Sequence, residues 1–184
     1  QMATSGILIH HNRQRALERI AQAQEQASTH FPAAQLDLTQ TEGEMPTSEA
    51  DLRDALEESR FRDLAAGRTL VGPHRADLYG VYAAKEIAAR DCSTGEQKAL
   101  LISLILANAH ALSQQIGVAP ILLLDEVSAH LDAGRRAALY DEICALGAQA
   151  WMTGTDRSLF AHLGERARFL NVSEDGGVSA VDAE

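Results

Sequence analysis

This chain of 184 residues has few aromatic residues, few cysteines and no long apolar run, and each of these absences excludes some classes of protein. Aromatic residues make up 4% of the sequence, so leucine, isoleucine, valine and alanine must fill any core. The two cysteines, Cys92 and Cys144, lack the spacing of metal ligands, which indicates reduced thiols rather than a disulfide framework. No apolar run reaches about 18 residues, the length of a membrane span, so we expect no membrane partner and a cytoplasmic location.

The chain also has fewer basic residues than acidic ones, 16 against 26. The net charge of −10 argues against a generally basic nucleic-acid-binding surface, although a local basic patch stays possible. The chain opens on Gln1 without a visible signal peptide, and we expect it to be part of a longer protein. The pattern G-x-x-x-x-G-K-S/T is absent, which excludes a phosphate-binding loop of that kind within these residues.

Apolar periodicity and turn residues predict two regions, a mostly helical lobe at 1–67 and an α/β region at 68–184. The predicted helices span 7–29, 48–66, 94–115, 132–146 and 156–164, and the predicted strands span 35–39, 69–71, 78–84, 121–125, 150–153, 168–172 and 177–181. The alternation of strand and helix after residue 94 predicts a mainly parallel sheet with helices.

The pattern also predicts which segments are buried. The helix at 94–115 is apolar almost all round and should lie in the core. The strand at 121–125 is a continuous hydrophobic run, typical of a parallel strand covered on both faces. Trp151 is expected in the core, whereas His10 and His11 are expected to be solvated. The first helix carries a thin apolar stripe, which consists of Ile9, Ala16, Leu17 and Ile20.

Two adjacent carboxylates, Asp125 and Glu126, follow the hydrophobic run at 121–124. Ligands of open α/β sheets gather at the carboxyl ends of strands, and alternate side chains of a strand point to opposite faces. Asp125 could hold Mg²⁺ directly or through water, because hard cations take oxygen ligands. Glu126 could orient and deprotonate a water, a contribution of about 10²–10⁴ in rate. A strand that merely ends in a solvated acidic turn is the alternative.

A polar turn, Ser93-Thr94-Gly95-Glu96, opens the long helix. Ser93 and Glu96 have the S-x-x-E spacing of a capping box, so a well-capped helix is one interpretation. The other uses the same free N–H groups, which together with the helix dipole attract an anion. Gly95 would let a phosphate approach the backbone, and the Ser93 hydroxyl would add a donor.

The polar turn at 93–96 followed by the apolar strand with its acidic pair at 121–126 identifies a protein family more specifically than either segment does alone. Residues 92–97, C-S-T-G-E-Q, resemble the signature motif of ABC-type ATPase heads of the SMC and Rad50-like superfamily. Residues 121–126 resemble its Walker B strand, and residues 128–132, S-A-H-L-D, resemble its D-loop. The closest resemblance is to the RecF family, through T-L-V-G-P-H-R at 69–75, S-T-G-E-Q-K-A-L-L at 93–101 and T-G-T-D at 153–156. The clear match covers about residues 68–172.

The resemblance implies the C-terminal half of an ATPase head at 68–184 and part of a helical arm at 1–67. It implies that Asp125 serves Mg²⁺ and that Glu126 serves the hydrolytic water. Thr155 or Asp156 would stand where many relatives place a switch histidine. The residues implied in nucleotide binding, partly across a dimer interface, are Ser93, Thr94, Gly95, Glu96, Gln97, Ser128, Asp132 and Thr155.

The resemblance further implies a protein that dimerises on ATP, grips DNA and assists recombinational repair with other recombination mediators, as a weak DNA-dependent ATPase. ATP and Mg²⁺ would require the missing N-terminal half or a partner subunit, so we expect the chain alone to be inactive. Two alternatives stay open. One is a head of an SMC, Rad50 or RecN type, although the arm lacks sustained heptads. The other is a non-catalytic dimerisation module, against which Glu126 counts.

Overall fold

The computed structural model describes residues 1–27, 29–128 and 131–183. The chain forms two compact units, Gln1–Val118 and Ala119–Glu184. The predicted boundary between residues 67 and 68 falls inside the first unit, where strands on either side of it pair. The division into an arm and a head therefore stays a prediction.

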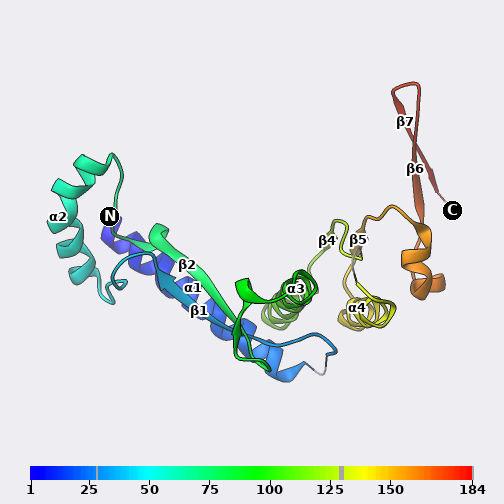
Figure 1. Ribbon diagram of the computed structural model, residues 1–184, viewed down its shortest axis with the longest axis horizontal. Coiled ribbons are helices and arrows are strands. Elements are labelled where there is room, and N and C mark those ends of the chain that lie inside the picture. Colours follow the sequence, from blue (N-terminus) through cyan, green and yellow to red (C-terminus); the bar gives the residue numbers. More distant parts are fainter. Residues whose placement is uncertain (28, 129–130, 184) are drawn as a thin grey trace. The chain divides into compact units, whose positions relative to one another are not determined.

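The first unit begins with two helices (Figure 1) that pack against each other and share a small core. Helix α1 spans Met2–Gln26 and helix α2 spans Glu49–Ala66. Ala3, Ile7 and Leu52 form the centre of this core. A Cβ at Gly6 would lie 2.8 Å from the Leu52 Cδ2 atom, so the close approach of the two helices depends on glycine at this position.

The predicted stripe of α1 is partly wrong. Ile9 is 44% exposed and Ala16 is exposed, whereas Ala3, Ile7, His10 and Ala23 are buried. Leu17 and Ile20 are half-buried, as a stripe requires. The helix begins five residues before the predicted start, and that extra turn contributes the buried residues Ala3 and Gly6. His10 was expected in solvent, but burial, with smaller contributions from His11 and Arg13, lowers its pKa.

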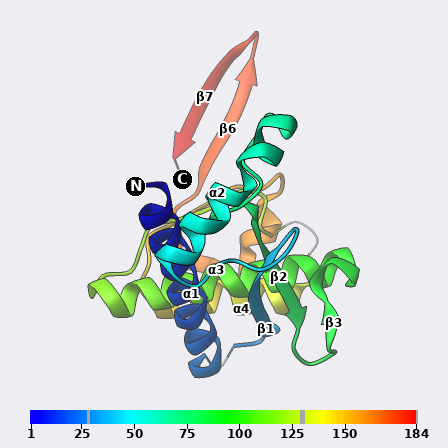
Figure 2. The same cartoon turned by 90° about the vertical axis from the view of Figure 1, so that its left-hand side faces the viewer.

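The first unit also holds an antiparallel sheet, β1-β2-β3 (Figure 2). Strand β1 spans Ala34–Gln40, β2 spans Ala76–Tyr82 and β3 spans Ile87–Ala88. The predicted strand at 69–71 is wrong. The segment is a loop, because the Leu70 N–H donates to the Asp63 carboxylate at 3.0 Å and the Thr69 carbonyl contacts the His74 ring at 2.8 Å. The short helix η1, Pro73–Arg75, then leads into β2.

A second short helix, η2 (Ala89–Asp91), connects β3 to α3, which spans Thr94–Ile116 and packs against α1 (Figure 2). The predicted all-round burial is wrong: Leu100, Ile102 and Leu106 are buried, but Leu101 is 58% and Ile116 61% exposed. By length and composition alone α3 could cross a membrane. A helix in the core of a globular protein can meet the same criteria of length and composition. Because α3 packs one face against α1, this finding does not indicate a membrane span.

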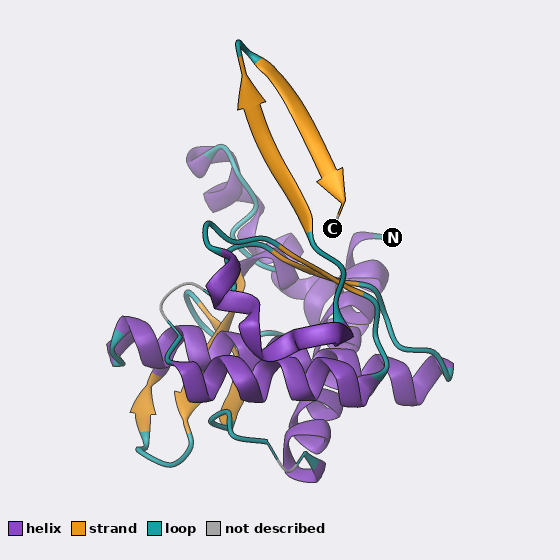
Figure 3. Ribbon diagram, turned by 90° about the vertical axis from the view of Figure 1, so that its right-hand side faces the viewer, coloured by secondary structure: helices purple, strands orange, loops and turns teal. Residues whose placement is uncertain are grey.

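The second unit carries the parallel strands. Strand β4, Leu122–Leu124, pairs in parallel with β5, Ala150–Met152. Between them helix α4 spans Ala133–Leu146, and after β5 comes the 3₁₀ segment η3, Arg157–Arg166. The antiparallel hairpin of β6, Leu170–Asp175, and β7, Val178–Ala183, follows η3 (Figure 3). The predicted α/β class with parallel strands is confirmed.

One face of the β4–β5 pair is open. Leu122 and Leu124 are each 6% exposed, whereas Leu123 is 77% and Trp151 55% exposed. Ile121, just before β4, is also exposed. The expectations that this strand is covered on both faces and that Trp151 lies in a core are therefore wrong for this chain.

Candidate functional site

The signature segment forms a complete capping box at the start of α3. Ser93 is the N-cap, and its hydroxyl accepts a hydrogen bond from the Glu96 N–H at 3.4 Å. The Glu96 carboxylate accepts from the Ser93 N–H at 2.9 Å and from the Ser93 hydroxyl at 2.7 Å. Both interpretations of the segment use this geometry, because the cap orders the first turn whose N–H groups would face an anion.

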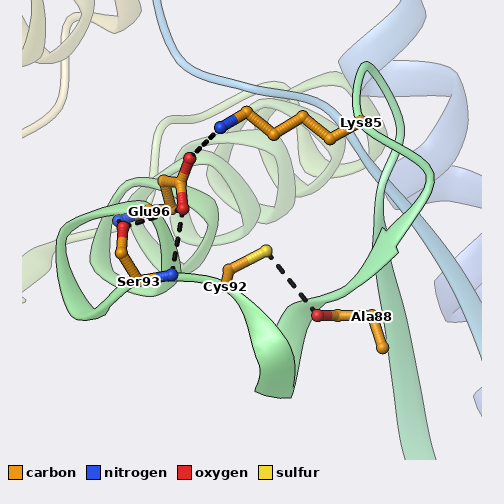
Figure 4. A network of polar contacts seen from close by, with 5 residues as sticks. All are labelled: Lys85, Ala88, Cys92, Ser93 and Glu96. Carbon is orange, nitrogen blue, oxygen red and sulfur yellow. Dashed lines mark hydrogen bonds and ion pairs between the residues drawn. The ribbon is translucent and has the colours of Figure 1, made fainter.

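Lys85 joins this network from the turn between β2 and β3 (Figure 4). Its ammonium forms an ion pair with Glu96 Oε1 and lies 5.5 Å from the centroid of the Tyr82 ring. The hydrogen bond from Lys85, followed by those from Ser93, lowers the pKa of Glu96 to about 2, and the same pair raises the pKa of Lys85. Lys85 was not predicted from the sequence, because nothing in the local pattern links residues eleven positions apart.

This network predicts a pH dependence at the start of α3. The folded-state pKa of Glu96 lies below its ordinary value of 4.5, so the cap stabilises the fold above pH 4.5 and loses this contribution as the pH falls towards 2. In Lys85→Met, the pKa of Glu96 should rise towards its ordinary value. An NMR titration of the Glu96 carboxyl measures both values.

The matched control for that titration is Arg53→Met, which removes the cation of an exposed ion pair with Glu49 on α2. This change should leave the pKa of Glu96 where it is. A Glu96 carboxyl that titrates near pH 4.5 in the unsubstituted chain would mean that the Lys85 network does not form in solution.

The other predicted signature residues divide into two groups. The Gln97 side-chain amide donates to the carbonyls of Arg90 and Cys92, at 3.0 and 3.1 Å, and so holds the turn before the helix. Thr94 is exposed, and a Cβ at Gly95 would meet nothing within 4 Å. The space over Gly95 is therefore open to a group from outside this chain.

Asp125 and Glu126 lie together in the turn after β4, and both are exposed. Because β4 ends at Leu124, the two side chains do not follow strand alternation as expected. Glu126 has a positive φ of 50°, a left-handed conformation that costs a non-glycine residue about 1 kcal/mol or more. The Thr153 hydroxyl donates to Asp125 Oδ1 at 2.5 Å and accepts from the Glu126 N–H at 2.9 Å.

Ser128, the first residue of the D-loop segment, is anchored inside the second unit. Ser128 is fully buried, and its hydroxyl lies 2.6 Å from the Tyr140 hydroxyl, which donates to the Leu159 carbonyl at 3.0 Å. Burial raises the pKa of Tyr140. The predicted contact of Ser128 with a nucleotide stays a prediction, since this geometry gives its hydroxyl a structural role. Ala129 and His130 lie outside the described residues.

Two further predicted residues act as helix caps here. The Asp132 carboxylate accepts from the Arg135 N–H at 2.9 Å at the start of α4, and this bond lowers the pKa of Asp132. Asp156 accepts from the Ser158 N–H at 2.7 Å at the start of η3, and its pKa is lowered for the same reason. Thr155 is exposed in the bend before that cap. Its role at the switch position stays a prediction.

The donor set around Asp125 fits Mg²⁺ of the kind that binds with a nucleotide. Among residues 1–27, 29–128 and 131–183, no group of three histidine, cysteine or acidic side chains could hold a metal ion alone. Mg²⁺ commonly takes one or two carboxylates and completes its shell with water and phosphate oxygens. One exposed carboxylate at a strand end satisfies that requirement.

Comparison with known proteins gives a consistent family. The chain is 51% identical over 183 residues to the DNA replication and repair protein RecF of Rhizobium rhizogenes, covering 96% of this chain and 49% of that protein. It is 54% identical over 155 residues to RecF of Agrobacterium fabrum, covering 82% and 41%. No family model matches. The chain thus spans about half the length of the curated relatives it matches.

Solved structures agree at the level of the fold. A structure of RecF with ATP has a TM-score of 0.69 at 23% identity and covers 99% of this chain and 48% of that protein. An Smc head bound to a domain of ScpA has a TM-score of 0.55 at 19% identity, covering 93% and 44%. The extended identity to RecF sequences and the better fit to the RecF fold point the same way. This chain belongs to the RecF family and represents a C-terminal portion of it.

Proposed function

We propose that this chain supplies the magnesium and water-activating carboxylates of an ATP-dependent DNA-binding protein that acts in recombinational repair and the repair of replication gaps. The observation that carries the proposal is the exposed Asp125-Glu126 turn at the carboxyl end of a parallel strand. In this proposal Asp125 binds Mg²⁺ on the phosphates of ATP. Glu126 orients and deprotonates the attacking water.

The signature turn serves a second nucleotide. Ser93, Thr94 and Gly95 present a hydroxyl-rich, sterically open helix start, which suits the γ-phosphate of ATP bound to another copy of the protein. To reach that phosphate the Ser93 hydroxyl must leave the Glu96 carboxylate, which Lys85 neutralises. Each copy would then contribute to two sites, and ATP would hold the homodimer together.

The biological role rests on the relatives. They are DNA replication and repair proteins, and the RecF structures are described as a recombination mediator in the RecFOR pathway. We extend to this protein the binding of DNA, cooperation with other mediators and a cytoplasmic location. An SMC-type head is the weaker candidate, because the Smc structures fit with lower TM-scores. A non-catalytic module would have no use for the energetically unfavourable left-handed backbone of Glu126, which the Thr153 hydroxyl holds in place.

The test of this function is ATP turnover by the full-length protein, measured with and without DNA. We expect slow hydrolysis that DNA stimulates and that depends on Glu126. Turnover that survives the loss of that carboxylate would contradict the proposal.

We further propose that the open β4–β5 face is covered by the half of the protein that lies outside this chain. The relatives are about twice as long as the matched region, and a parallel strand is normally covered on both faces. Leu123→Asp should therefore change the free energy of unfolding of this chain by less than about 0.5 kcal/mol. In the full-length protein the same buried, unpaired carboxylate should cost about 3 kcal/mol or more.

Thermal unfolding of both forms measures this difference. The control is Ser173→Asp on β6, because an exposed polar residue needs no covering segment and should tolerate the change in either form. If the full-length protein tolerates Leu123→Asp as well as the chain does, another segment does not cover this face.

A further inference from the structure

Thr153 occupies a special place at the end of the parallel sheet. Its N–H donates to the Leu124 carbonyl at 3.2 Å, which extends the β4–β5 pairing by one position beyond Met152. Its hydroxyl therefore lies beside the first residues of the turn after β4. From there it donates to Asp125 Oδ1 at 2.5 Å and accepts from the Glu126 N–H at 2.9 Å.

One hydroxyl thus holds both members of the acidic pair, each through a different part of the residue. The bond to Asp125 restrains the carboxylate itself and leaves its second oxygen to face a cation. The bond to Glu126 restrains the backbone at a left-handed residue, whose φ of 50° sets the direction of its side chain. Threonine can do both because a hydroxyl is donor and acceptor at once.

We propose that Thr153 is a positioning residue that orients the Asp125 carboxylate towards Mg²⁺ and holds the Glu126 turn in its left-handed conformation. The inference rests on the function proposed above and gives a role to a residue that the sequence marked only as part of the T-G-T-D segment. Groups that orient a metal ligand in this way commonly contribute about 10–100-fold to metal affinity or activity. In this proposal Thr153 acts through Asp125 and Glu126 and not directly on the nucleotide or the attacking water.

A purely structural role is the competing explanation, because Thr153 also continues the sheet. The two roles separate, since the sheet bond uses the backbone N–H and positioning uses the hydroxyl. Thr153→Val keeps the backbone bond and the branched shape but loses the hydroxyl. Thr153→Ser keeps the hydroxyl and loses the methyl group, so it should rescue a positioning role.

The experiment uses the full-length protein and follows ATP hydrolysis as a function of ATP and Mg²⁺ concentration, with thermal unfolding in parallel. For Thr153→Val we expect kcat to fall by about 10–100-fold, a higher Mg²⁺ concentration at half-maximal rate, and little change in KM for ATP. Thr153→Ser should recover most of kcat. Thr39→Val, the same change on β1 in the first unit, should behave like the unsubstituted protein.

The outcomes separate this inference from the function on which it rests. If Asp125→Asn and Glu126→Gln abolish turnover while Thr153→Val does not, the positioning role is wrong and the proposed function stands. If all three variants keep full turnover, the proposed function fails as well. Equal losses in Thr153→Val and Thr153→Ser would also overturn the inference. So would failure of Thr153→Val and Thr153→Ala to fold, because the hydroxyl would then be a requirement of the fold.

Discussion

Glu126→Gln in the full-length protein should trap an ATP-bound dimer. The amide keeps the size of the side chain but cannot take a proton from water, so we expect the rate of hydrolysis to fall by about 10²–10⁴. Binding of ATP and closure of the dimer should persist, because neither needs a base. Size-exclusion chromatography with light scattering in ATP and Mg²⁺ measures the dimer, and phosphate release measures turnover.

Glu174→Gln is the matched control for this trap. Glu174 is an exposed residue of β6, so the same change in charge should alter neither dimerisation nor turnover. A Glu126→Gln protein with normal hydrolysis and a normal lifetime of the dimer would show that the base lies elsewhere. Loss of ATP binding in this variant would instead point to a role of Glu126 in the ground state.

Ser93→Arg should leave the binding of ATP intact and abolish ATP-dependent dimerisation. Ser93 is exposed at the start of α3, and an arginine there removes the capping hydroxyl and fills the space that a partner's γ-phosphate would enter. Loss of an N-cap side chain costs about 1 kcal/mol, which should not unfold the protein. Nucleotide titration and light scattering test the two halves of this prediction separately.

Mixing two inactive variants gives a sharper test of sites shared between subunits. In a dimer of Ser93→Arg with Glu126→Gln, one site combines the intact carboxylates of the first protein with the intact signature turn of the second. Part of the ATP turnover should therefore return on mixing. Ser179→Arg, a change on the exposed strand β7, is the control for an added arginine. No recovery on mixing, with normal dimerisation of Ser93→Arg, would place the signature turn outside the nucleotide site.

Local sequence predicted the ends of three helices well. The helices predicted over 48–66, 94–115 and 132–146 begin at the N-cap residues Ser48, Ser93 and Asp132, and the first and last of them end at Gly67 and Gly147, with φ of 65° and 67°. These features depend on residues within about one turn of one another, so the pattern alone contains the necessary information. The parallel pairing of β4 and β5 was predicted for a similar reason, from a continuous apolar run and the helix that follows it.

Burial was predicted less well, because it depends on what covers a segment. Leu101, Leu123 and Trp151 have the large apolar side chains typical of a core, but they are 58%, 77% and 55% exposed. The converse error concerns His10, a polar residue that is 8% exposed on the face that α1 buries. Hydrophobicity indicates that a residue favours burial, but only the packing partners present in the fold decide whether it is buried.

By itself the sequence determined which groups are available for chemistry: a capped helix start at Ser93 and two carboxylates, Asp125 and Glu126, after an apolar strand. Only the tertiary structure decided how these groups are held. Lys85 reaches Glu96 from a neighbouring turn, and Thr153 reaches the acidic pair from 27 and 28 residues away. Side-chain hydrogen bonds between distant segments leave no periodic trace in a sequence, because they depend on which strand ends become neighbours on folding.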